Sequence, residues 1–273
     1  MRQFGFVVCA LCCFAANSFG QRSDLLKAKA QSCLKPWVDA VGYIAQKSPT
    51  NKDIQQIQAI ISNSMIAEPA VDKKGQLAFR YVYTTVNIEK TVMSLVPICS
   101  MENLPPVWKE RFAHKNFTAE AIPFQNVLIL GNGLKLPILY RGLVFLHEMR
   151  HAYQNWNPLP SKDSPDYHLN KELDAYEFEF KIFDELNLPE YNSLINSEIT
   201  RFKKEPPGSG LSPNLSDPRV GKIFQSADQN PMIRQVLATE IFIRAIFKLY
   251  DTQNPNEVAF QKKIAFLRSI GYK

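Results

Sequence analysis

Two histidines stand four residues apart in the stretch LVFLHEMRHAYQNW (143–156), and an acid follows the first of them. In a helix, His147 and His151 fall on one face, because each residue turns the chain by about 100°. Two imidazoles one turn apart can bind a single Zn²⁺ through their ring nitrogens, and Glu148 between them can act as the general base toward a water molecule. The stretch therefore predicts a metal site that carries out hydrolysis.

The other side of the same helix is apolar and contains Phe145, Met149, Ala152 and Trp156. Such a helix packs its apolar side against the core and directs its histidines into a cleft. Because a five-residue motif also occurs by chance in ordinary amphipathic helices, a third ligand decides the interpretation. A histidine ten residues after His147 would be one choice, but Asn157 stands there. The metzincin arrangement is therefore excluded, and a glutamate from a following helix is the other option.

A second helix is predicted from about residue 165 to 187, after three prolines that end the first one. Four acids on it compete for the metal: Glu172, Asp174, Glu177 and Glu179. Glu172 borders the apolar stripe of this helix and shares a face with Glu179, whereas Asp174 and Glu177 point well away from Glu172. Glu172 is therefore the best candidate and Glu179 the second, while Asp174 and Glu177 are expected to face water.

The motif and its spacing resemble the gluzincin zinc peptidases, which include the thermolysin type and a large group of aminopeptidases. Glu172 lies 21 positions after His151, and Ala175 matches the small residue that often follows the third ligand in that family. The stretch HEMRHAYQ also resembles the HExxHxxQ form of several small bacterial zincins. The resemblance implies one Zn²⁺ per chain held by His147, His151 and Glu172, with Glu148 as the general base.

This resemblance covers residues 140–183, about a sixth of the chain. Thermolysin-like enzymes carry an acid four residues after the third ligand to orient a histidine, but Tyr176 stands at that position here. A second donor is normally needed to stabilise the negative charge on a carbonyl oxygen under attack. The candidates for that role are His168, Tyr167, Tyr153 and Arg244. Each has a structural interpretation as well, such as a pairing of Arg244 with Glu240 one turn earlier.

The elements that must position this site predict an α+β fold of the zincin-like type, with a small N-terminal sheet, an active-site helix and a mainly helical C-terminal half. Residues 23–47 and 51–67 have helical patterns, and the β-branched and aromatic alternation of 77–97 predicts a hairpin. Residues 125–130 form a further strand, which could offer its edge to an extended peptide or be a plain sheet strand. Later helices are expected to start at Pro165, Pro218, Pro231 and Pro255, each of which follows a capping side chain.

The N-terminus has the pattern of a secretory signal peptide over residues 1–20, in which Arg2 precedes an apolar run of 13 residues. The remainder, 21–273, is expected to form a single catalytic domain. Its predicted parts are a helical region 21–70, a sheet region 71–140, active-site helices 141–187 and a helical part 188–273. Export to a periplasmic or extracellular compartment would favour a disulfide between Cys33 and Cys99, although two separate buried thiols are the alternative.

Composition excludes several classes of function. The formal net charge of +6 is mildly basic and spread along the chain, without a Lys/Arg cluster interleaved with aromatics, so nucleic acid is not an expected partner. After signal cleavage no stable membrane insertion is expected, because 231–250, the most apolar later stretch, carries four charges. The sequence thus predicts a secreted zinc metallopeptidase acting on peptides or proteins, of undetermined oligomeric state. The alternative is a non-catalytic zincin-like binding or structural module of the cell envelope or secreted fraction.

Overall fold

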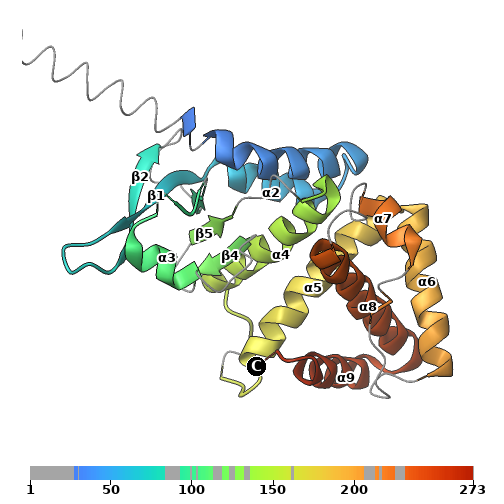
Figure 1. The fold of residues 1–273 in the computed structure, drawn as a ribbon. Coiled ribbons are helices and arrows are strands. Elements are labelled where there is room, and N and C mark those ends of the chain that lie inside the picture. Colours follow the sequence, from blue (N-terminus) through green and yellow to red (C-terminus); the bar gives the residue numbers. More distant parts are fainter. Residues whose placement is uncertain are drawn as a thin grey trace, which may run out of the picture.

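A computed structural model of the chain places a mixed sheet in the first half and mainly helices in the second (Figure 1). The α+β class predicted from the sequence is confirmed. The structure describes the following residues: 28–29, 31–83, 93–98, 100–102, 104–112, 119–122, 127–131, 136–160, 163–205, 213–214, 217–224 and 231–272. The predicted signal peptide over 1–20 lies outside them.

Within the described residues two helices precede the sheet, one over residues 31–47 and the other, α2, over Lys52–Ser62. The side chain of Asn51 caps α2 by accepting a hydrogen bond of 2.9 Å from the backbone N–H of Ile54. The chain then enters a strand at Met65, so the helix predicted over 51–67 is wrong in its last residues. The backbone of the stretch MIAEPAV instead forms hydrogen bonds with two neighbouring strands of the sheet.

The helix over 31–47 is fixed to the rest of the fold by buried contacts. Trp37 is fully buried, and its Nε1–H donates to the carbonyl of Gly131 at 3.1 Å. Cys33 on the same helix forms a disulfide, whereas Cys99 lies outside the described residues. The pairing of Cys33 with Cys99 therefore stays a prediction.

The sheet of the described residues has five strands in the order β2-β1-β3-β5-β4. Their bounds are β1 Met65–Val71, β2 Leu77–Tyr83, β3 Ser94–Pro97, β4 Ala119–Ile122 and β5 Val127–Leu130. β1, β3 and β5 run parallel, and the edge strands β2 and β4 pair antiparallel with their neighbours.

One prediction about the strands is wrong, and one pair of alternatives is decided. Within the described residues, β2 and β3 do not form the hairpin expected within 77–97, because β2 pairs with β1 while β3 pairs in parallel with the other edge of β1. β5 is the plain sheet strand of the two alternatives, because β3 and β4 occupy the edges that a peptide would need. The physical reason is burial: every residue of β3 and of β5 is buried, so these strands need neighbours on both sides.

Side chains alternate between two cores along β5. Leu128 and Leu130 belong to the large core that the long helices share, whereas Val127 and Ile129 belong to a smaller core beneath α3 (Pro106–Phe112). Trp108 of α3 is fully buried there, and its Nε1–H donates to the carbonyl of Ala70 at 2.7 Å. The sheet is therefore covered on both faces.

Six helices make up the second half of the chain within the described residues. They are α4 Ile138–Trp156, α5 Tyr167–Leu186, α6 Pro189–Lys204, α7 Pro218–Phe224, α8 Pro231–Gln253 and α9 Asn256–Ser269. The starts predicted at Pro218 and Pro231 are confirmed, and α9 begins directly after Pro255. Among the residues described, no helix combines the length and the apolar character that crossing a membrane requires.

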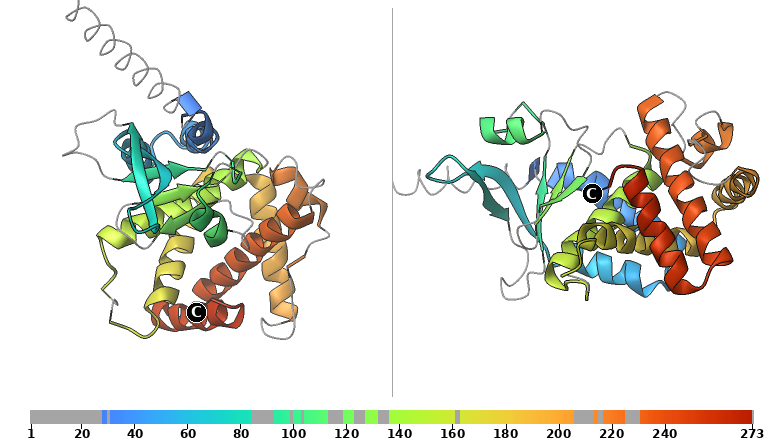
Figure 2. Two further views of the ribbon diagram at one scale, coloured as in Figure 1. Left: turned by 60° about the vertical axis from the view of Figure 1, so that its left-hand side comes forward. Right: turned by 90° about the horizontal axis from the view of Figure 1, so that it is seen from below.

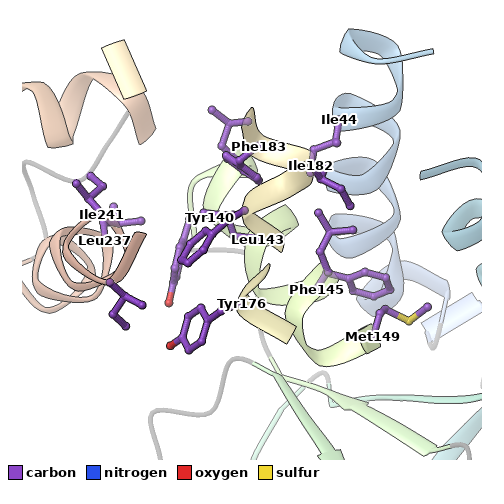
Figure 3. Close-up of a cluster of buried hydrophobic side chains, with 14 of the residues drawn as sticks. Ile44, Tyr140, Leu143, Phe145, Met149, Tyr176, Ile182, Phe183, Leu237 and Ile241 are labelled. Carbon is purple, nitrogen blue, oxygen red and sulfur yellow. The ribbon is translucent and has the colours of Figure 1, made fainter. Parts of the chain in front are cut away.

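Helix α4 lies in the middle of the molecule, between the sheet on one side and the C-terminal helices on the other (Figure 2). Phe145 and Met149 extend from it toward the helix over 31–47, and the ring of Phe145 lies 6.1 Å from that of Trp37 (Figure 3). Tyr140 and Leu143 extend on another side, toward α8. Apolar packing on two sides thus fixes the rotation of α4, and with it the direction of its histidines.

Candidate metal centre

Helices α4 and α5 pack against each other, and polar contacts fix how they are aligned. The guanidinium of Arg150 on α4 binds both carboxylate oxygens of Asp174 on α5, at 2.6 and 2.9 Å. The Nε2–H group of Gln154 donates to the carbonyl of Lys171 at 2.9 Å and to Asp174 at 2.7 Å. This alignment brings Glu172 on α5 opposite the histidines of α4.

His147, His151 and Glu172 form a possible metal site. The Nε2 atoms of the two histidines are 3.1 Å apart, and Glu172 places Oε2 at 3.3 Å from the first and Oε1 at 3.4 Å from the second. Ligands at about 2.0–2.2 Å from a tetrahedral Zn²⁺ lie about 3.3–3.6 Å from one another. The two Glu172 distances, each to a different oxygen, fall within this range, and the distance between the Nε2 atoms is slightly shorter. The three side chains therefore converge closely enough to hold one ion.

Each histidine is held by a hydrogen bond at its other ring nitrogen. His147 Nδ1 donates to Glu179 Oε2 at 3.1 Å, and His151 Nδ1 donates to Gln154 Oε1 at 3.0 Å. Because both Nδ1 atoms carry the hydrogen, the lone pairs of neutral imidazoles are left on the Nε2 atoms that face each other. Two facing lone pairs beside a carboxylate suit a cation, so the residues present fit a Zn²⁺ ion.

The partial exposure of the three side chains leaves room for a reactant. His147 exposes 13% of its side chain, His151 12% and Glu172 28%. A structural zinc site is usually closed by four protein ligands, whereas a catalytic one keeps a position for water or substrate. Among the described residues three side chains converge here, and they remain partly accessible.

In the metal-free protein the ionisable side chains of the site shift one another's pKa values. Burial alone would lower the pKa of His147, but its hydrogen bonds with Glu172 and Glu179 outweigh burial, and the pKa of His147 lies well above its usual range. Burial alone would raise the pKa of Glu172, but its contacts with His147 and His151 have the larger effect and lower this pKa far below its usual range. A proton on His147 therefore takes the place of the cation in the metal-free protein.

Glu179 and Asp174 have roles that the sequence did not predict. Glu179 was the second candidate for the metal, but its contact is with the outer nitrogen of His147, and its side chain is only 2% exposed. Asp174 was expected to face water, which is wrong, since it is held by Arg150 and Gln154. The outer nitrogen of His147 thus meets Glu179, seven residues after Glu172, and not the residue four positions after it.

Tyr176 packs where that acid was expected. Its ring lies edge-on to His147 with 4.6 Å between centroids, and its hydroxyl is 2.6 Å from that of Tyr272. Burial raises the pKa of Tyr176 well above its usual range, so it stays a neutral phenol. This ring shields one side of His147 from water.

A cavity of about 170 Å³ opens beside His147. Its walls come from α4, α5, α8 and residue 272, and the lining residues are Tyr140, Leu143, Val144, His147, Glu148, Tyr176, Glu179, Glu240 and Tyr272. Glu148, the predicted general base, therefore lies on the same cavity as the first histidine of the motif. Tyr140, Glu240 and Tyr272 were not predicted to be part of the site.

None of the four residues considered as a second donor lies among the described residues that line this cavity. Tyr153 lines a separate hollow with Arg150 on the other side of α4, and His168 is exposed. The guanidinium of Arg244 binds Asp184, so its expected pairing with Glu240 is wrong. The tyrosines that line the cavity are Tyr140, Tyr176 and Tyr272.

Comparisons of the chain with protein-family models, with curated proteins and with solved structures gave no match.

Proposed function

We propose that this protein is a secreted zinc metallopeptidase with a zincin-like fold. One Zn²⁺ would be held by His147 Nε2, His151 Nε2 and a carboxylate oxygen of Glu172, and Glu148 would be the general base. The observation that carries this proposal is the separation of 3.1–3.4 Å between these three ligands, together with the hydrogen bond on the outer nitrogen of each histidine.

In the proposed reaction, a bound zinc ion supplies Lewis acidity, which makes a nearby water more acidic and polarises the carbonyl of the substrate. Glu148 takes a proton from the attacking water and delivers it to the nitrogen of the departing amine. Glu179 and Gln154 keep the two imidazoles in the tautomer that presents Nε2 to the metal. The position of Glu148 on the open cavity supports catalysis, because a purely structural zinc site has no use for this carboxylate.

The proposed export is supported by the disulfide at Cys33. Disulfides persist in oxidising compartments outside the cytosol, which agrees with the signal peptide predicted over 1–20. The zincin-like fold is supported by the contacts of the HEMRH helix, α4, with β4 and β5 on one side and α5 on the other. Peptides or proteins are the proposed substrates.

Metal analysis and digestion of a peptide library test the proposal together. The experiment compares the unaltered protein with Glu148→Gln and with the control Glu190→Gln, which changes an exposed acid on α6. All three proteins are expected to hold about one zinc per chain, because Glu148 is not a ligand. Cleavage products are expected from the unaltered protein and the control only.

Three outcomes would contradict this proposal at different points. Equal digestion by Glu148→Gln and the unaltered protein would show that Glu148 is not the base. A failure of all three proteins to bind zinc would show that the histidines and Glu172 do not form a metal site. Zinc binding without digestion by any of the three would favour the non-catalytic module instead.

A further inference from the structure

Tyr272 lies between two hollows of the protein. One is the cavity of about 170 Å³ beside His147, and the other is a larger hollow of about 530 Å³. Among the described residues, Tyr272 is the one that lines both. The two hollows also come close to each other along α8, where Glu240 lines the cavity and Thr239, the residue before it, lines the larger hollow. Tyr272 and this turn of α8 therefore separate the two spaces.

Tyr272 is held in this position by its backbone and by its hydroxyl. It follows α9, and its backbone N–H donates to the carbonyl of Leu267 at 3.2 Å. Gly271 before it has a φ of 106°, a conformation that favours glycine and turns the chain away from the helix. The hydroxyl of Tyr272 is 2.6 Å from that of Tyr176, and the two rings are edge-on with 6.1 Å between centroids. Burial raises the pKa of Tyr272 above its usual range, so the side chain stays neutral.

The two hollows differ in volume and in the residues that line them. The cavity contains His147 and Glu148, and its volume of about 170 Å³ is close to the roughly 150 Å³ of a cavity that binds one benzene molecule. The larger hollow lies farther from the histidines, and its apolar walls come from Pro213, Phe242, Ile243 and Ile270. A group that enters beside His147 can therefore reach these apolar walls only if Tyr272 leaves space for it.

We propose that Tyr272 is a specificity-determining residue, which limits the cavity beside His147 to substrate side chains no larger than about a benzene ring. The proposal rests on the proposed peptidase function, because the cavity adjoins His147 and Glu148 and so would receive the side chain next to the cleaved bond. The ring of Tyr272 acts by filling space, and its contact with Tyr176 keeps the ring in place. Removal of the ring joins the cavity to the larger hollow, so that a longer side chain can extend through both.

A binding measurement tests this size limit without hydrolysis and without metal. Benzyl alcohol and 4-phenylbenzyl alcohol, which is longer by one ring, are titrated into the metal-free protein, and the imidazole NMR signals of His147 report binding in the cavity. Benzyl alcohol is expected to shift these signals in every protein tested. 4-Phenylbenzyl alcohol should bind Tyr272→Ala at least about tenfold more tightly than the unaltered protein, since burial of roughly two carbon atoms of its second ring already has this effect.

Three further variants separate the ring of Tyr272 from its hydroxyl and from the fold. Tyr272→Phe keeps the ring and should bind both probes like the unaltered protein. Tyr272→Leu keeps an apolar side chain on α9's last turn and should, like Tyr272→Ala, admit the longer probe. Phe260→Ala removes an exposed ring of α9 outside both hollows and is the control, which should behave like the unaltered protein. Melting curves check that each variant is folded.

Matched peptides then test whether the same limit applies to substrates. Three versions of one peptide carry leucine, phenylalanine or 4-phenylphenylalanine next to the cleaved bond. The unaltered protein is expected to cleave the first two and to discriminate against the third. In Tyr272→Ala the ratio of kcat/KM for 4-phenylphenylalanine to that for leucine should rise by at least about tenfold. Because this measurement is a ratio, a general loss of activity in the variant does not affect it.

The outcomes separate this inference from the peptidase proposal. Equal affinity of 4-phenylbenzyl alcohol for the unaltered protein and Tyr272→Ala would overturn the role of Tyr272, and so would an unchanged ratio of cleavage, while the peptidase stands. A size limit on binding that Tyr272→Ala removes, without cleavage of any peptide, would support the role of Tyr272 and contradict the peptidase. Loss of the size limit in Tyr272→Phe would overturn the explanation that the ring acts by filling space.

Discussion

Replacement of Glu179 by glutamine tests how the outer hydrogen bond of His147 supports metal binding. The change keeps the size of the side chain but removes the negative charge that His147 Nδ1 meets at 3.1 Å. Because the side chain of Glu179 is 2% exposed and that of His147 is 13% exposed, water cannot take over this contact easily. The imidazole of His147 should therefore become a weaker ligand and a less firmly oriented one.

The expected loss of zinc affinity in Glu179→Gln is limited, because Glu179 contacts only one of the three candidate ligands. Loss of such an outer partner typically weakens metal binding by 10- to 100-fold, which is about 1.4–2.7 kcal/mol. Two effects oppose each other in the metal-free protein: burial disfavours a charge on Glu179, whereas the contact with protonated His147 favours it. Glu179→Gln is thus expected to change the melting temperature of the metal-free protein only slightly.

A zinc titration against a chromophoric chelator measures the dissociation constants of Glu179→Gln, Glu190→Gln and the unaltered protein. Thermal unfolding of the same metal-free samples provides the second measurement. Replacement of the exposed Glu190 by glutamine should leave the zinc affinity unchanged. It should change the free energy of unfolding by no more than about 1 kcal/mol. Equal dissociation constants for all three proteins would refute the role given to Glu179. Weaker binding that comes with a large loss of stability would show a general disruption of the fold instead.

Three further predictions concern pH, the second histidine and the core. The pKa of His147 is raised in the fold, so protonated His147 stabilises the metal-free protein fully below about pH 6.5. This stabilisation is lost as the pH rises through the pKa that His147 has in the folded protein. Zinc must displace the proton on His147, so the affinity for zinc should rise by up to about tenfold per pH unit. The increase in melting temperature on adding zinc should therefore be larger at about pH 8 than at about pH 6. An increase that does not depend on pH would contradict this prediction. Gln154→Ala removes the acceptor for His151 Nδ1 and two donated bonds, and should weaken zinc binding at least about tenfold in the same chelator titration. Phe145→Ala should lower the free energy of unfolding by about 3–5 kcal/mol in a denaturant titration, because this ring is fully buried against Trp37.

The part of the site that local geometry determines could be predicted from the sequence. His147 and His151 are one helical turn apart, so any helix over that stretch brings their rings to the same side. The phase of the next helix favoured Glu172 in the same way, and the structure places its carboxylate at 3.3 and 3.4 Å from the two imidazoles. The contact of Glu179 with the outer nitrogen of His147 was harder to predict, because it depends on how far α5 is shifted along α4. That shift is fixed by Arg150 and Asp174, whose pairing has no local signature.

The order of the strands in the sheet could not be predicted from the sequence for a related reason. The pattern of 77–97 shows that strands are present, but it does not say which strand lies beside which. In the structure β3 pairs with β1 and β5, so its partners come from segments about 30 residues away on each side. An expected hairpin between neighbours in the chain was therefore the wrong choice. The complete burial of β3 and β5 is the property that requires two partners for each.

The cavity beside the metal centre combines both kinds of contact, and this explains why most of its wall was missed. Tyr140, His147 and Glu148 come from one helix, whereas Glu240 and Tyr272 are brought in from about 90 residues or more along the chain. Packing of α8 against α6 and α9 determines where Glu240 lies, and nothing near it in the sequence indicates a neighbouring metal site. The histidine motif can therefore indicate a candidate metal site, whereas the surroundings of that site depend on residues of the C-terminal helices that only the folded chain brings near it.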